Sequence, residues 1–164
     1  VFKSWEVLAG LPHVRLETHT RRRRLAVDWL RPATTADGAG QLVCSQRQVG
    51  AGTFALTPPQ PILQGPLRAG ATWTWTGHVG DDPCRAEFKI LRREPLDGVE
   101  ILEIEQVTTL GGPGRELVSR RSQVFAAGRG LISETGTTAA HQPTRRVDIE
   151  VHATALEPSA PAKD

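Results

Sequence analysis

Methionine and tyrosine are absent from this chain of 164 residues, and lysine is scarce. Of the 20 basic residues, 3 are Lys and 17 are Arg. A GC-rich genome produces this bias, and so does recognition of phosphate or carboxylate by guanidinium groups. The only dense basic cluster, at positions 21–24, lacks the wider basic surface of a nucleic-acid module. We therefore expect a solvated turn there and no nucleic-acid partner.

Long hydrophobic runs are also missing. No apolar stretch approaches the roughly 20 residues that a membrane-spanning helix requires, so we expect no transmembrane segment in this sequence. Because translation starts with methionine, we expect that Val1 is not the native first residue and that a leader can precede it.

Cysteine is limited to Cys44 and Cys84, which stand 40 positions apart. Two thiols with no neighbouring Cys or His partner make a poor metal site, and we expect no metal and no cofactor. In an exported protein the pair would form a disulfide, whereas in a cytosolic protein both would be buried thiols. We favour a disulfide between Cys44 and Cys84.

A catalytic apparatus is not recognisable in this sequence. The five histidines are scattered, and no Gly-x-Ser-x-Gly nucleophile motif occurs. The densest group of potential ligands is His78, Asp81, Asp82 and Cys84, in a turn where local geometry already favours Asp. We predict no catalytic and no metal-binding residues and expect that the chain is not an enzyme, with an enzyme of dispersed site as the least favoured alternative.

Alternation of apolar and polar residues with a period of two is the dominant positive signal. It is clearest near the C-terminus, where Val147, Ile149 and Val151 alternate with Asp148 and Glu150. Residues i and i+2 share a face only in a strand. Sixteen Gly and 12 Pro separate such segments at short intervals. The pattern predicts a mostly β protein with an antiparallel meander and little helix.

One β domain is expected over residues 1–156, followed by an extended tail over 157–164. The proline-rich segment 57–61 is too poor in N–H donors for a central strand and is predicted to be a linker. It divides the domain into parts 1–56 and 62–156. The two parts share an order of features at a spacing near 90 residues, so a two-part repeat and chance similarity of two meanders both remain open.

Trp73 and Trp75 stand in the most distinctive segment, P-L-R-A-G-A-T-W-T-W-T-G at positions 66–77. Together with F-A-A-G-R-G-L-I-S-E at 125–134, it resembles a group of uncharacterised bacterial envelope proteins and lipoproteins with a P-L-x-x-G-x-x-W-x-W strand and an aromatic-x-x-G-x-G strand. The resemblance covers roughly residues 62–156 and departs at 95–100, where P-L-D-G-V-E replaces the V-P-A-G-T-F-like turn. It implies a curved antiparallel sheet, a half-barrel or open barrel, similar to lipoprotein carriers.

The resemblance also implies an exported protein of the periplasm or cell envelope. We expect a non-enzymatic binding or scaffold module, an accessory subunit of a larger bacterial assembly that pairs with protein partners through its sheet edges. The alternative is a periplasmic carrier of a lipid or lipoprotein acyl chain. The residues expected to form the apolar groove or core are Trp29, Trp73, Trp75, Phe88 and Phe125. A filled core favours the scaffold, and a continuous cavity favours the carrier.

Overall fold

A computed structural model describes residues 2–19, 24–142 and 145–154 of the chain. In these residues the secondary structure is entirely β, as the two-residue periodicity predicts. In chain order the strands are β1 (Phe2–Leu8), β2 (Leu11–His19), β3 (Arg24–Thr34), β4 (Gly40–Val49), β5 (Gly52–Gln64), β6 (Thr72–Val79), β7 (Asp82–Leu96), β8 (Val99–Leu110), β9 (Leu117–Ala126), β10 (Gly130–Gln142) and β11 (Arg145–Thr154).

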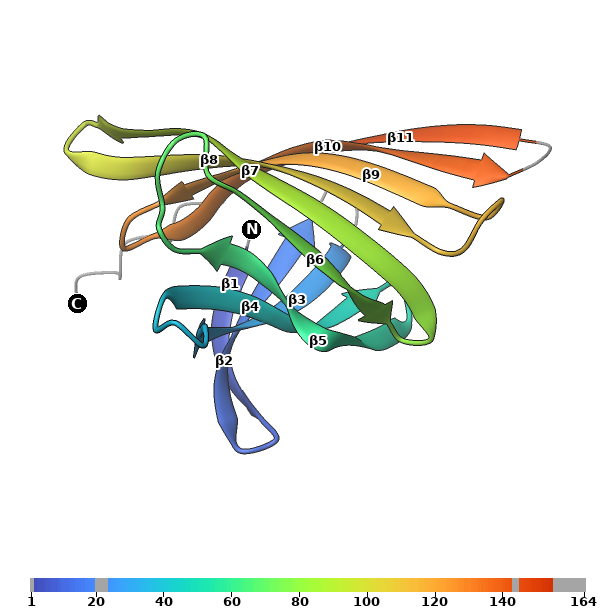
Figure 1. Cartoon of the computed structure of the whole chain (residues 1–164), viewed down its shortest axis with the longest axis horizontal. Coiled ribbons are helices and arrows are strands. Elements are labelled where there is room, and N and C mark those ends of the chain that lie inside the picture. The colour runs from blue at the N-terminus through green and yellow to red at the C-terminus, as the bar shows by residue number, and fades with distance from the viewer. Residues whose placement is uncertain (1, 20–23, 143–144, 155–164) are drawn as a thin grey trace, which may run out of the picture.

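The strands form one 11-stranded sheet whose spatial order follows the chain from β1 to β11. Every neighbouring pair is antiparallel, so the sheet is a meander. The sheet curls on itself, and β1–β5 lie across from the long strands β7–β10 (Figure 1). The predicted curved antiparallel half-barrel is confirmed. The expected tail at 157–164 and most of the arginine cluster, positions 21–23, lie outside the described residues.

Two-residue turns join several of these strands. The β1–β2 hairpin closes at the pair Leu8 and Leu11, and its two turn residues, Ala9 and Gly10, have φ angles of 49° and 76°. Positive φ at both central positions defines the type I′ turn, whose twist matches that of the flanking strands. The β7–β8 hairpin repeats this geometry at Asp97-Gly98, with φ angles of 51° and 77°.

The segment predicted to be a linker, 57–61, is instead part of β5. Ala55 pairs with Gln46 of β4, and Gln60 pairs with Cys44, so residues 56–59 of β5 stand opposite a single residue of β4. Prolines lack the backbone N–H that a ladder requires, and the β4–β5 ladder breaks where they occur. The linker interpretation was wrong because it treated the loss of ladder bonds as the end of the strand.

Within this break β5 turns from one part of the sheet to the other. Leu56 and Thr57 leave β4 and pair with Val79 and His78 of β6. These two pairs are the whole backbone register between β5 and β6, whereas β6 and β7 pair along the full length of β6. The proline-rich segment is therefore a corner that joins β1–β5 to β6–β11.

One hydrophobic core fills the space between the two parts of the sheet. Trp73 of β6 stacks on Phe88 of β7, with ring centroids 5.0 Å apart and planes within 6°. The core cluster draws on strands from both parts and comprises Leu16, Leu30, Cys44, Leu56, Ile62, Trp73, Trp75, Cys84, Ala86, Phe88, Ile90, Leu102, Ile104, Phe125 and Leu131. Burial of this apolar surface favours the curled arrangement over a flat sheet.

Two indole hydrogen bonds attach β6 to the corner. Nε1 of Trp73 donates to the carbonyl oxygen of Pro61 at 3.0 Å, and Nε1 of Trp75 donates to that of Pro58, also at 3.0 Å. Each bond pairs an indole donor of the core with a backbone carbonyl of the proline-rich segment. The bonds therefore compensate for the short β5–β6 register.

Gly77 allows β5 to approach β6 at this corner. A Cβ atom at position 77 would lie 2.5 Å from the Thr57 carbonyl oxygen, 2.6 Å from Cζ2 of Trp75 and 3.0 Å from Cδ of Pro58. Two of these neighbours belong to the backbone or the proline ring and cannot rotate away. Only glycine fits at this position without displacing the corner.

We expect Gly77→Ala to lower the free energy of unfolding by about 1–3 kcal/mol, because the added methyl group overpacks the corner. Urea denaturation followed by tryptophan fluorescence measures the change. Gly112→Ala is the matched control: a Cβ there meets nothing within 4 Å, and its expected effect is within about 0.5 kcal/mol. Equal effects of the two substitutions would contradict the close-approach explanation.

Candidate functional site

Four of the five aromatic residues predicted to share an apolar face do so. Trp73, Trp75, Phe88 and Phe125 belong to one buried cluster. Trp29 is also buried, with 9% of its surface exposed, but it lies outside that cluster, and its indole Nε1 donates to Oε2 of Glu6 at 2.8 Å. The face that carries the other four residues is a packed core.

The position of Trp29 outside the main cluster has a physical cause. Strand β3 is buried on both faces, and its interior face carries Asp28 and Leu30 rather than Val27 and Trp29. Alternation predicts that the polar residues of a strand face water. Asp28 is an exception because a cation from β4 pairs with it inside the protein.

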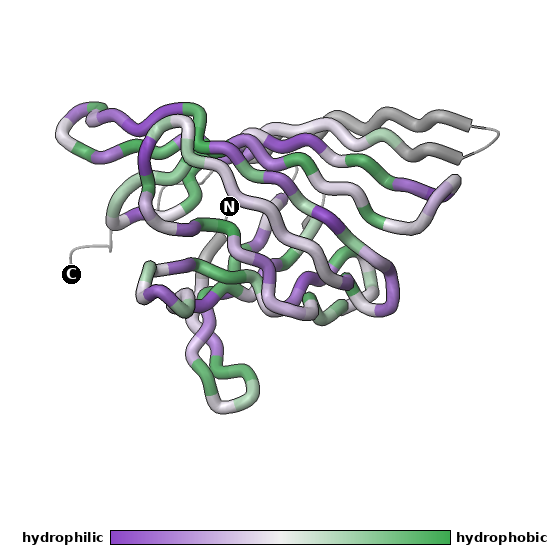
Figure 2. The backbone as a smooth tube through the Cα atoms, in the orientation of Figure 1, coloured by the Kyte–Doolittle hydropathy of each residue, from purple (hydrophilic) through white to green (hydrophobic). Residues whose placement is uncertain are grey.

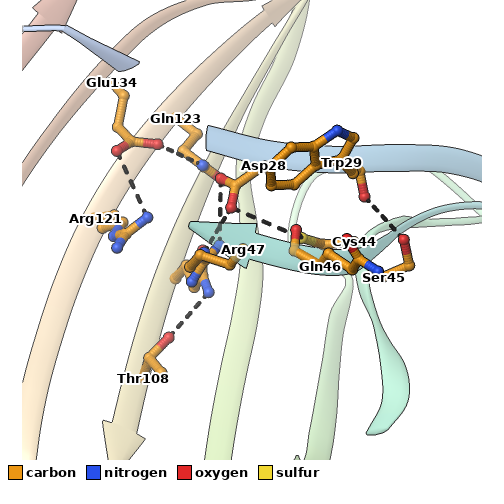
Figure 3. Close-up of polar contacts among 11 residues, drawn as sticks. Asp28, Trp29, Cys44, Ser45, Gln46, Arg47, Thr108, Arg121, Gln123 and Glu134 are labelled. Atoms are coloured by element: carbon orange, nitrogen blue, oxygen red, sulfur yellow. Dashed lines mark hydrogen bonds and ion pairs between the residues drawn. The ribbon is translucent and has the colours of Figure 1, made fainter. Parts of the chain in front are cut away.

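That cation is Arg47. Its Nε lies 2.6 Å from Oδ1 of Asp28 and its Nη2 lies 3.4 Å from Oδ2, so the guanidinium holds both carboxylate oxygens (Figure 3). Both side chains are about nine-tenths buried. Burial is the largest single influence on the pKa of Arg47 and would lower it, but the interactions with Asp28, Cys44 and Glu134 together outweigh burial, and the net direction of the pKa is upward.

A second buried acid faces this pair from the other part of the sheet. Glu134 of β10 accepts a hydrogen bond from Nε2 of Gln123 at 2.7 Å and forms an ion pair with Nη1 of Arg121 at 3.6 Å. The negative charge of Glu134 also contributes to the raised pKa of Arg47, which places both groups in one electrostatic environment (Figure 3). The polar interior, defined as Asp28, Arg47, Arg121, Gln123 and Glu134, thus joins β3 and β4 to β9 and β10.

Three buried amide oxygens lack a partner in the described part of the chain. The Oε1 atoms of Gln60, Gln106 and Gln123 have no hydrogen-bond partner among the described residues, and all three residues are at least 95% buried. A buried carbonyl without a partner costs on the order of 1–3 kcal/mol. These oxygens can accept bonds from small donors, whereas the titratable groups beside them are already in ion pairs. The interior therefore has the character of a structural polar network.

The disulfide predicted between Cys44 and Cys84 is not formed in the structure. Both residues are free, buried thiols of the core cluster. The Cys44 Sγ donates to the Gln46 carbonyl oxygen at 3.2 Å and lies 3.8 Å from Oδ1 of Asp28. Burial is the main cause that raises the pKa of both thiols, so both stay protonated at neutral pH.

The ligand group suggested by the turn before β7 does not gather around a common point. His78, Asp81 and Asp82 are exposed, whereas Cys84 is buried in the core. Among the described residues, no group of three or more His, Cys, Asp or Glu side chains is placed to hold a metal ion. The part of the chain that the structure describes also contains no helix long and apolar enough to cross a membrane.

Strand β1 carries exposed apolar residues that sequence reasoning missed. Trp5 and Val7 are each 73% exposed, and Leu11, across the turn, is 49% exposed. The β1–β2 hairpin projects from the body of the molecule, and its tip is apolar (Figures 1 and 2). The available signal was the spacing of Trp5 and Val7 on one face, next to an Ala-Gly turn.

The backbone of β1 is open on one side. β1 is the first strand of the sheet and pairs only with β2 among the described strands. A two-residue turn makes its closing pair, here Leu8 and Leu11, a hydrogen-bonded pair, and such pairs then alternate with non-bonded pairs. Lys3, Trp5 and Val7 are therefore the residues whose N–H and C=O groups point away from β2.

Pro12 supports this assignment. It stands opposite Val7 in the register, at a position where β2 needs no N–H toward β1. We define the open edge as β1 with its outward backbone groups at Lys3, Trp5 and Val7. It combines unpaired donors and acceptors with exposed apolar side chains, which is the combination that binds another strand.

Comparison of the chain with protein-family models, with curated proteins and with solved structures gave no match.

We expect Arg47→Leu to lower the free energy of unfolding by about 3–5 kcal/mol, since it leaves Asp28 buried without its cation. The double variant Arg47→Leu, Asp28→Leu should recover most of that loss, because it removes the unpaired carboxylate that the single variant leaves buried. Arg85→Leu, which breaks an exposed pair with Glu87 at 2.9 Å, is the control and should change stability by less than about 1 kcal/mol. Chemical denaturation checks all three, and a double variant no more stable than Arg47→Leu would contradict a buried pair.

We expect Cys44 and Cys84 to resist thiol reagents in the native state, because both are buried and protonated. Titration with Ellman's reagent should find two thiols per chain after unfolding in urea without reductant and almost none before it. A chain that shows no thiol after unfolding would instead contain the disulfide.

Proposed function

We propose that this chain is a non-enzymatic binding or scaffold module of the bacterial envelope, an accessory subunit that joins a protein partner through a sheet edge. The observation that carries the proposal is the open edge. Trp5 and Val7 lie on it in water, at an edge strand whose outward backbone groups have no partner strand in the described part of the chain. Native proteins usually cover or charge such an edge, so an uncovered apolar one indicates a site of strand addition.

Side-chain contacts that hold β1 in place favour the addition of a strand to it. Glu6, on the opposite face of β1, accepts the indole N–H of Trp29 and lies 3.3 Å from Nε of Arg15. Two side chains of β2 and β3 thereby fix β1 in the plane of the sheet. Association then costs less conformational entropy, because β1, which is one side of the interface, is already ordered.

The packing of the core supports a scaffold over an acyl-chain carrier. A carrier needs an apolar space of several hundred Å³ for its ligand. Of the aromatic residues expected to line such a groove, Trp73 stacks on Phe88, and Trp73 and Trp75 donate hydrogen bonds to carbonyls of the β5 corner. The buried acids Asp28 and Glu134 are paired with arginines, which supports a structural role over catalysis. The envelope location rests on the resemblance of the 66–77 and 125–134 segments.

The test is affinity capture from a bacterial envelope extract, followed by hydrogen exchange on the purified complex. We expect a specific protein to bind the wild-type chain and Leu96→Lys, but not Trp5→Lys, which places a charge on the open edge. Leu96 is a matched control because it is a large apolar residue of another hairpin and is 60% exposed. The captured partner should slow exchange at Lys3, Trp5 and Val7. Equal capture by Trp5→Lys, or native material that carries stoichiometric lipid, would contradict the proposal.

A further inference from the structure

We infer that the strand that pairs with the open edge is β1 of a second copy of this chain, in an antiparallel register centred on Trp5. The inference rests on the proposed function, because it names the partner of the same edge. It follows from three features of β1: the direction of its backbone groups, the residues that each register brings together, and the face on which Trp5 lies.

Backbone direction limits the registers. Lys3, Trp5 and Val7 carry the outward N–H and C=O groups, and hydrogen-bonded pairs of an antiparallel ladder exchange both bonds. Two copies of β1 must therefore place these residues opposite one another. With Trp5 opposite Trp5 of the second copy, Lys3 falls opposite Val7 and every outward group has a partner.

The neighbouring registers are worse. A shift that places Trp5 opposite Val7 brings Glu6 opposite Glu6 of the second copy, and like charges directly opposite are destabilising. A shift the other way places Lys3 opposite Trp5 and leaves Val7 opposite position 1, outside β1. In the register centred on Trp5, Glu6 falls opposite Ser4, and no like charges meet.

The side chains agree with this register. Trp5 pairs with Val14, Val14 with Leu30, and Leu30 with Cys44, so Trp5 lies on the face of the sheet that forms the core. Residues directly opposite in a ladder share a face. The core face thus extends beyond the covered part of the sheet at Trp5 and Val7. A two-fold axis through Trp5 brings this surface against the same surface of the second copy.

Symmetry makes the assembly finite. An antiparallel pairing of two identical edges is isologous, so each copy uses the same residues and the contact closes after two chains. Both copies bring an edge that Glu6, Arg15 and Trp29 already hold in place. The outcome is a dimer with one continuous sheet across its two-fold axis.

Light scattering coupled to size exclusion tests the dimer over micromolar to near-millimolar concentrations. We expect the wild-type chain and Leu96→Lys to approach twice the monomer mass as concentration rises, and Trp5→Lys to stay at the monomer mass. Because Trp5 is exposed, Trp5→Lys should keep the native circular dichroism spectrum. In the dimer, amide exchange at Lys3, Trp5 and Val7 should slow, and in Trp5→Lys it should be fast.

Cysteine substitution tests the register. Hydrogen-bonded antiparallel partners have Cα atoms about 5.5 Å apart, within the usual range for a disulfide. Under mild oxidation Trp5→Cys should give a covalent dimer on a non-reducing gel, because position 5 faces itself. Val7→Cys and Leu96→Cys should stay monomeric on that gel, whereas a Lys3→Cys chain mixed with a Val7→Cys chain should form a heterodimer.

Several outcomes would overturn the inference: a wild-type chain that stays monomeric at all concentrations, a dimer that persists in Trp5→Lys, or cross-linking through Val7→Cys but not Trp5→Cys. Failure of the dimer is distinguishable from failure of the proposed function. A monomeric chain whose β1 amides become protected by a different protein overturns self-pairing and leaves the binding module standing. If neither a second copy nor any other protein slows exchange at the β1 amides, both the dimer and the proposed binding function are overturned.

Discussion

Two indole N–H groups and the proline carbonyls that accept them hold this architecture together. The β4–β5 ladder is interrupted at residues 56–59 of β5, and Trp73 and Trp75 donate from within the core to the carbonyls of Pro61 and Pro58. Only two residue pairs join β5 to β6 through the backbone. The same two side chains that fill the core therefore also fix the angle between the two parts of the sheet.

Much of this fold is predictable from local pattern. The strands follow from two-residue alternation, and Asp97-Gly98 marks a hairpin because positive φ at both positions is tolerated there. The shared face of Trp73 and Trp75 also follows from their spacing. The corner does not, because prolines indicate lost donors but not which distant side chains replace the missing bonds.

The site was less accessible to sequence reasoning. Asp28 lies in the interior because Arg47, 19 residues away on another strand, neutralises it, and alternation contains no information on that partner. Conversely, Trp5 and Val7 have the pattern of a buried face and lie in water. Burial depends on which element covers a strand, and a periodicity within one strand cannot report on its neighbours.

The strictly sequential strand order has a kinetic consequence. Most ladders start at a turn of a few residues, so the entropy cost of closing them is small. The β5–β6 ladder is the exception, because its two pairs join Thr57 to His78 and Leu56 to Val79. Strands that neighbour one another in the sheet also follow one another in the chain, which lowers the contact order relative to a β fold with crossovers. The sheet can therefore grow hairpin by hairpin in the order of synthesis. Interactions across the core, such as that between Glu134 and Arg47, can form only after both parts of the sheet are present.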